Sequence, residues 1–146
     1  CDEYGLDNIS VGAVIAFSME LFEQGIISLE DTDGLELRFG NHHAMIEMIH
    51  RIAQREGLGA VLADGVVAAA RQIGRGSEVY ALNVKGLELP AYDVRGAIAH
   101  GLNYMTSYTG ADHKRGYSAQ AIFGSSIPVA VDRLTVVSAQ STRRLK

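Results

Sequence analysis

The stretch ISVGAVIAFSMELFEQ, residues 9–24, decides the class of fold. Three of its apolar residues recur at intervals of four: Ala13, Phe17 and Leu21. This interval is typical of one face of an α-helix. Asp7 or Ser10 is suited to cap the start of such a helix, and the glycine at position 25 follows its end. The stretch therefore predicts a long amphipathic helix near the start of the chain.

Four further segments have helical composition or periodicity: 41–56, 58–73, 96–106 and the residues from Pro128 onward. The buried face of the first of these is expected to contain Met45, Met48, Ile49 and Ile52. Residues 78–95 differ, because Pro90 forbids a long helix and the side chains at 79–84 alternate weakly. The sequence thus predicts a mainly α-helical fold of about five helices with one short extended segment, forming a single domain over residues 1–146.

The composition is that of an ordinary globular protein and excludes several classes. Of the 146 residues, 47% are hydrophobic and 21% are charged, which is enough for one compact core. The net charge of −4 gives no electrostatic reason to expect nucleic acid or a membrane surface as a partner. No apolar run approaches the roughly 18 residues of a membrane span, and no signal peptide is visible, so the cytoplasm is the expected compartment. A lone cysteine, Cys1, excludes an internal disulfide framework and, by itself, a cysteine-ligated cluster.

The opening residues DEYGLDN, positions 2–8, combine three carboxylates, those of Asp2, Glu3 and Asp7, with a glycine. Gly5 is suited to a positive φ that ends one helix, and Asp7 is suited to cap the next. Carboxylates on such a turn can accept hydrogen bonds from the N–H groups of a heterocycle, or hold a divalent cation. On spacing alone, the more frequent explanation is a helix–turn–helix linkage with capping acids.

A second group of chemically active residues is the loop TGADHKRGY, positions 109–117. Its glycines flank a carboxylate, a histidine and two cations: Asp112, His113, Lys114 and Arg115. A histidine titrates near neutrality and can move a proton, while Lys or Arg can bind an anion such as phosphate. From the residues alone, a solvated charged loop is the more frequent explanation.

The other histidines lack the spacing of a metal site. His43 and His50 are seven residues apart on one predicted helix, with His42 beside them, whereas a helical metal site needs i, i+4 spacing or further ligands. These three are expected at the surface and no metal ligand is assigned. His100 is given no role.

An ordered series of motifs resembles the aldehyde ferredoxin oxidoreductase family. Residues 2–8 are similar to the family's pterin-binding motif, Asp-x-x-Gly-Leu-Asp/Cys-x. The series continues through IAQREGLG at 52–59, LADG at 62–65 and, most clearly, VKGLELPAYDVRG at 84–96. The segment DTDGLE at 31–36 also fits the pterin pattern loosely. It is interpreted as a surface turn, because the family's second copy lies further towards the C-terminus.

The resemblance implies that this chain is an internal, mostly helical part of a longer tungsten- or molybdenum-pterin oxidoreductase. Such an enzyme oxidises aldehydes to carboxylic acids with ferredoxin as electron acceptor, and contains a bis-pterin metal centre and a 4Fe-4S cluster. By resemblance, the cofactor-binding residues are Asp2, Leu6, Asp7 and Arg115. His113 aligns with the family's active-site histidine and is expected to be the catalytic residue that moves protons.

By the same resemblance, the expected partners are ferredoxin, a small aldehyde and the missing domains of the parent chain. The isolated chain is expected to bind neither metal nor cluster and to be inactive. It is also expected to associate with itself through apolar surface that the missing domains would cover. The competing interpretation is a non-catalytic helical binding module, derived from the same fold, that uses residues 112–115 to bind a partner.

Overall fold

The computed structural model describes residues 1–114 and divides the chain into two compact units, Cys1–Leu89 and Pro90–Lys146. The first unit contains helices α1 (Asn8–Glu23), α2 (His42–Gln54), α3 (Leu58–Leu62) and α4 (Val66–Ile73), with short 3₁₀ helices at Asp2–Tyr4 and Ser77–Tyr80. It ends in strands β1 (Asn83–Val84) and β2 (Leu87–Glu88), and the described part of the second unit contains helix α5 (Ile98–Thr106). The predicted mainly helical class is confirmed, whereas the prediction of a single domain stays a prediction.

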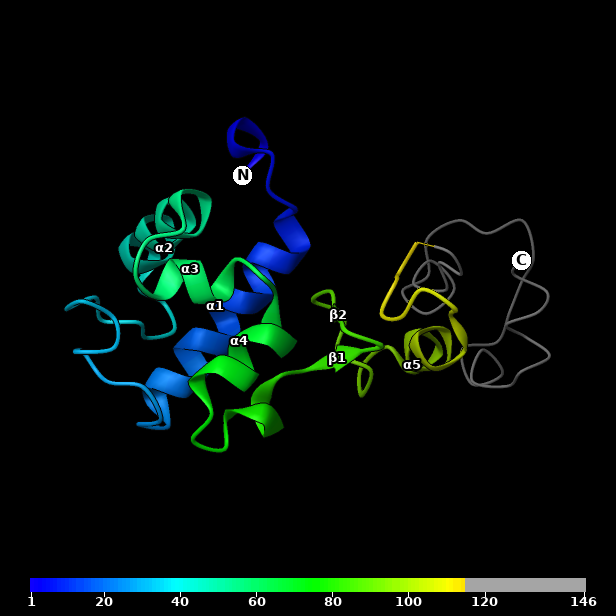
Figure 1. Ribbon diagram of the computed structural model, residues 1–146. Coiled ribbons are helices and arrows are strands. Elements are labelled where there is room, and N and C mark those ends of the chain that lie inside the picture. The colour runs from blue at the N-terminus through cyan, green and yellow to red at the C-terminus, as the bar shows by residue number, and fades with distance from the viewer. Residues whose placement is uncertain (115–146) are drawn as a thin grey trace. The chain divides into compact units, whose positions relative to one another are not determined.

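Helix α1 carries much of the core of the first unit and contacts α2, α4 and β2 (Figure 1). It begins where the sequence predicts, because the Asp7 side chain accepts a hydrogen bond of 2.7 Å from the Ser10 N–H and so caps the helix. Its buried side chains are Val11, Val14, Ile15, Phe17, Ser18, Met19 and Leu21. The predicted helix is therefore confirmed, but it is not clearly amphipathic, because Ile9 and Ala16 on its exposed side are apolar and Ala13 of the predicted stripe is only partly buried.

Helix α2 is also confirmed, but its buried face differs from the predicted one. The buried residues are Ala44, Met48 and Ile52, which follow one another at intervals of four and so form a single stripe. Met45 is 42% exposed, and its prediction as a core residue is wrong. Ala44 is buried instead. Met45 follows it in sequence and lies about 100° further around the helix, away from the buried stripe.

The predicted helix 58–73 is wrong as one element, since α3 and α4 are separated by a break that Gly65 makes. Gly65 has a φ of 87°, and the following N–H, of Val66, donates a hydrogen bond of 2.9 Å to Glu88 Oε1. The other carboxylate oxygen of Glu88 accepts a 3.1 Å hydrogen bond from Ser10 Oγ. A Cβ at position 65 would lie 2.7 Å from Glu88 Oε1, so glycine is needed both for the backbone and for the space.

A second glycine, Gly59, allows α3 to approach α2 closely. A Cβ at this position would lie 2.3 Å from the carbonyl carbon of Arg51 and 2.4 Å from its oxygen. These are backbone atoms of α2 and cannot move aside as a side chain would. The contact between the two helices therefore depends on the absence of a side chain here.

Strands β1 and β2 form an antiparallel hairpin in which Asn83 pairs with Glu88 and Val84 with Leu87. The two turn residues, Lys85 and Gly86, have φ values of 55° and 85°, as a two-residue type I′ turn requires. Asn83 Oδ1 accepts a 3.1 Å hydrogen bond from the Gly86 N–H and fixes this turn. The predicted extended segment is thus present at 83–88, while residues 77–80 form a 3₁₀ helix instead.

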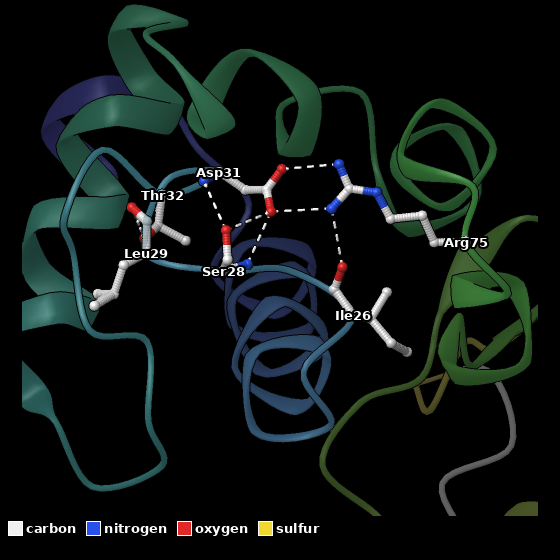
Figure 2. A network of polar contacts seen from close by, with 6 residues as sticks. All are labelled: Ile26, Ser28, Leu29, Asp31, Thr32 and Arg75. Atoms are coloured by element: carbon white, nitrogen blue, oxygen red, sulfur yellow. Dashed lines mark hydrogen bonds and ion pairs between the residues drawn. The ribbon is translucent and has the colours of Figure 1, made fainter.

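The segment DTDGLE, interpreted above as a turn, is a turn, and its first carboxylate fastens it to the end of α4. Figure 2 shows the Asp31 carboxylate facing the Arg75 guanidinium, at 2.9 and 3.0 Å, with Ser28 on its other side. Arg75 also donates a 3.0 Å hydrogen bond to the Ile26 carbonyl. The bond to Arg75, followed by those from Ser28, holds the pKa of Asp31 well below its usual range.

The described part of the second unit has a different kind of core around α5. Its buried side chains from Ala97 onward are Ala97, Ala99, His100, Asn103, Tyr104 and Ala111. The predicted helix 96–106 is confirmed as α5, and the helix expected from Pro128 lies outside the described residues. Within residues 1–114, no helix combines the length and apolar composition needed to cross a bilayer.

Candidate functional site

The first group of predicted site residues lies on one tight turn before α1. The Cys1 carbonyl accepts hydrogen bonds from the Tyr4 and Leu6 N–H groups, at 2.9 and 3.1 Å, and Gly5 has a φ of 66°. Leu6 is half-buried and packs on the core of the first unit, whereas Asp2 and Asp7 are exposed. The turn therefore presents the carboxylates of Asp2 and Asp7, together with that of Glu3, beside a leucine that packs on the core.

These hydrogen-bond acceptors fit a heterocycle that carries N–H groups. Asp7 uses one oxygen, Oδ1, to cap α1, and a carboxylate has further acceptor positions on both oxygens. Leu6, which lies between the two acids in sequence, packs against the core of the first unit. The Tyr4 hydroxyl and His50 Nδ1 lie 3.0 Å apart, which ties the same turn to α2. The residues present fit the pterin role that the sequence assigns to Asp2, Leu6 and Asp7.

The predicted catalytic residue, His113, lies in the second unit, on the loop after α5. Asp112 Oδ1 accepts a hydrogen bond of 2.7 Å from the Lys114 N–H, so the carboxylate and its neighbours form a local turn around the histidine. The imidazole is partly buried, and the Tyr92 ring lies against it with 5.5 Å between the ring centroids. A partly covered imidazole of this kind is suited to proton transfer.

A line of rings continues behind Tyr92 into the core of the second unit. The Tyr92 and His100 ring centroids are 4.7 Å apart, and those of His100 and Tyr104 are 5.9 Å apart in an edge-to-face arrangement. Burial, followed by the charge of His113, lowers the pKa of His100. Burial, followed by the charge of Tyr92, raises the pKa of Tyr104.

The structure places the predicted residues in two groups. Asp2, Leu6 and Asp7 share the turn in the first unit, His113 lies in the second unit, and Arg115 lies outside the described residues. None of the three rings near His113 is expected from the sequence. The one signal in the sequence is that His100 and Tyr104 are four residues apart, so both lie on one face of α5. This spacing does not predict that Tyr92 lies next to them.

The histidines of α2 are at the surface, as expected. His42, His43 and His50 are all exposed. Among residues 1–114, no three His, Cys, Asp or Glu side chains are grouped so that they would hold a metal ion.

Comparison of the chain with known protein families identifies the class of protein to which this fold belongs. The family model described as aldehyde ferredoxin oxidoreductase, domains 2 & 3, matches residues 1–145. The chain belongs to the aldehyde ferredoxin oxidoreductase family.

Two curated relatives show how much of such a protein this chain represents. The chain is 47% identical over 119 residues to the tungsten-containing aldehyde ferredoxin oxidoreductase of Pyrococcus abyssi (strain GE5 / Orsay), a match that covers 80% of this chain and 19% of the relative. It is 34% identical over 134 residues to the aliphatic sulfonate oxidoreductase, WOR-like subunit, of Pyrococcus furiosus, covering 83% of this chain and 21% of the relative. The chain thus spans about a fifth of the length of these relatives.

A solved structure has a similar fold. The active-site complex BamBC of benzoyl coenzyme A reductase, in complex with 1,5-dienoyl-CoA, matches with a TM-score of 0.60 and 28% identity. The match covers 92% of this chain and 22% of that chain.

Proposed function

We propose that this chain is part of a tungsten-pterin oxidoreductase that oxidises aldehydes to carboxylic acids and passes the electrons to ferredoxin. The observation that carries the proposal is the match of the family model to residues 1–145, which include both the acidic turn and His113. The turn adds support, since its carboxylates, those of Asp2 and Asp7 among them, are exposed while Leu6 between them packs on the core.

In this proposal the turn binds one pterin. Asp2 and Asp7 accept hydrogen bonds from N–H groups of the pterin, and the backbone beside Leu6 supports its ring system. When bound, the tungsten centre supplies the two-electron redox chemistry, and an iron–sulfur cluster of the parent relays electrons. Arg115 is proposed to contact the pterin or its phosphate.

His113 is proposed to move protons during turnover. Oxidation of an aldehyde by water forms one C–O bond, breaks the aldehyde C–H bond, and releases two electrons and two protons. Ferredoxin accepts the electrons one at a time, and His113 accepts a proton at a ring nitrogen. The Tyr92 ring against it restricts the orientations of the imidazole.

The test uses the full-length parent, produced without oxygen in medium containing tungstate and molybdate. Asp7→Asn removes the charge while asparagine can still cap α1, so the fold is retained and pterin content is expected to fall. Glu36→Gln in the turn DTDGLE is the matched control and is expected to keep the cofactor. His113→Gln is expected to keep the cofactor and to lose activity by a factor of about 10² to 10⁴.

Metal, iron and pterin contents are measured for each purified variant, together with aldehyde oxidation. A well-folded parent that contains no tungsten, molybdenum or iron would contradict the proposal and favour the binding-module interpretation. Equal cofactor loss in the Asp7 and Glu36 variants would remove the assignment of the turn.

A further inference from the structure

The second unit buries a histidine that the proposed function leaves unused. His100 is 0% exposed and lies on the inner face of α5, one turn before Tyr104. Burying an imidazole costs free energy unless specific interactions compensate, whereas an apolar side chain of similar volume would have no such cost. The position therefore calls for an explanation other than filling space.

The His100 ring contacts the rings of two tyrosines. Tyr104 meets its ring edge-on, with centroids 5.9 Å apart and an interplanar angle of 79°. The Tyr92 ring also contacts His100, with 4.7 Å between the ring centroids and an interplanar angle of 48°. Both distances are in the range in which ring pairs interact favourably. The orientation of the Tyr92 ring is thus coupled to His100.

Tyr92 in turn contacts the predicted catalytic residue. Its ring and the His113 ring are 5.5 Å apart and tilted by 36°. The partners of Tyr92 within this set of rings are therefore the two histidines, one on the core side and one on the loop. A change at His100 reaches His113 through one intervening ring.

The imidazole of His100 is chemically suited to this place. Its pKa is lowered by burial and by the charge of His113, so it is neutral when the surroundings are near pH 7. A neutral imidazole has one hydrogen-bond donor and one acceptor, and adds no second positive charge beside His113. An aliphatic residue would provide neither polar group.

We propose that His100 is a positioning residue for His113, acting by fixing the ring of Tyr92 through its polar imidazole. The proposal rests on the proposed function of His113 and adds a second histidine that does not touch the substrate. It distinguishes this polar role from packing, because packing would be served equally by any side chain of similar size.

The experiment compares two variants of the full-length parent, His100→Met and His100→Gln. Methionine fills the volume without hydrogen bonding, while glutamine retains a donor and an acceptor. The Met variant is expected to fold, to lose about 10- to 100-fold in kcat, and to change KM less than about twofold. The Gln variant is expected to recover most of the lost kcat. His43→Gln, at an exposed histidine of α2 away from the turn, is the matched control and is expected to behave as wild type.

A second measurement does not depend on enzyme activity. The rate at which diethylpyrocarbonate acylates His113, followed by mass spectrometry of the parent, reports how well Tyr92 covers the imidazole. We expect a several-fold faster reaction in the Met variant and a rate close to wild type in the Gln variant. A parent without oxidoreductase activity would defeat the proposed function, while the acylation rates would still decide the role of His100.

The outcomes are separable. Wild-type kcat and acylation rate in both folded variants would overturn the proposal, as would equal losses in both, which indicate packing alone. A faster acylation of His113 in a folded Gln variant would overturn it as well, even if the Met variant failed to fold.

Discussion

The two units bury different kinds of side chain. The first unit has a core of aliphatic and sulfur-containing residues, with fully buried members such as Leu21, Leu37 and Met48. The described part of the second unit buries alanines together with His100, Asn103 and Tyr104. Aliphatic burial contributes about 25 cal/mol per Å² of surface removed from water, whereas buried polar groups cost free energy unless they are paired. The first core also buries Ser18, Thr32, Ser77 and Glu88, and each of these is hydrogen-bonded, so the two cores differ in their share of aliphatic side chains rather than in the presence of polar ones.

The predicted site residues also have different surroundings in the two units. In the first unit the turn 2–7 lies outside the core and presents its acids to the surroundings. In the second unit the ring against His113 is that of Tyr92, which is half-buried and in turn contacts the buried His100. The Tyr104 hydroxyl is buried and has no hydrogen-bond partner among the described residues. Such groups are rare in proteins and mark positions where packing is not the only constraint.

The largest expected effect is in the aliphatic core. Leu21→Ala removes a side chain that is 0% exposed in the centre of the first unit. We expect a loss of about 2–5 kcal/mol in the free energy of unfolding, because the site leaves a cavity. Urea unfolding of the purified chain measures it. A loss below about 1 kcal/mol would mean that the first core is loosely packed and would remove the contrast between the units.

A smaller loss is expected where α2 and α3 meet. Gly59→Ala places a Cβ against the Arg51 backbone, and we expect a destabilisation of about 1–3 kcal/mol. The matched control is Gly12→Ala on the exposed side of α1, where nothing lies within 4 Å of the added carbon. That change is expected to stabilise the chain by about 0.5–1 kcal/mol, because alanine favours helices over glycine. Thermal unfolding of the two variants should therefore shift in opposite directions.

The Asp31–Arg75 contact is expected to make a pH-dependent contribution to the first unit. The folded-state pKa of Asp31 is lowered, so its contribution to stability is fully present above the unfolded pKa of about 3.9. The contribution is lost as the pH falls further, through the folded-state pKa. Asp31→Asn should therefore be less stable than wild type at pH 7, with a difference that shrinks below about pH 4.

Urea unfolding at a series of pH values measures this difference. Glu30→Gln changes the net charge equally at an exposed neighbouring position and serves as the control. A difference between wild type and Asp31→Asn that stays constant down to pH 2 would show that the ion pair contributes nothing.

The smallest expected effect is in the polar core, at His100. His100→Met is expected to change the free energy of unfolding by less than about 1.5 kcal/mol, because volume is kept and no imidazole has to be desolvated. Urea unfolding of this variant beside Leu21→Ala compares the two cores directly. A loss as large as that of Leu21→Ala would show that the second unit also depends on this side chain for stability.

The sequence predicts those parts of the fold that local rules determine. Helix α1 and its Asp7 cap follow from periodicity and capping chemistry, and α2 and α5 follow from the same kind of signal. The break between α3 and α4 is not local. Residues 58–73 have a continuous alanine- and valine-rich composition, and the carboxylate that caps α4 comes from Glu88, 22 residues after Val66.

The site shows the same limit. The turn 2–7 is contiguous in sequence, so its acids and glycine are recognised together. The line of rings joins Tyr92, which follows the hairpin, to α5 and to the loop of His113. These residues are brought together by the fold of the second unit, and no spacing in the sequence connects them. The pterin contacts and the role of His113 stay predictions.

Glu88 has a consequence for the order in which the first unit can be completed during synthesis. Its carboxylate bonds to Ser10, 78 residues earlier, and to the first N–H of α4. A ribosome that adds about 5–20 residues per second therefore completes α4 about 1–3 seconds before it adds Glu88, the shared acceptor. During that interval the α4 terminus and the Ser10 hydroxyl depend on water for their hydrogen bonds. The nascent chain thus closes this unit only when the hairpin emerges, shortly before the residues of the second unit follow.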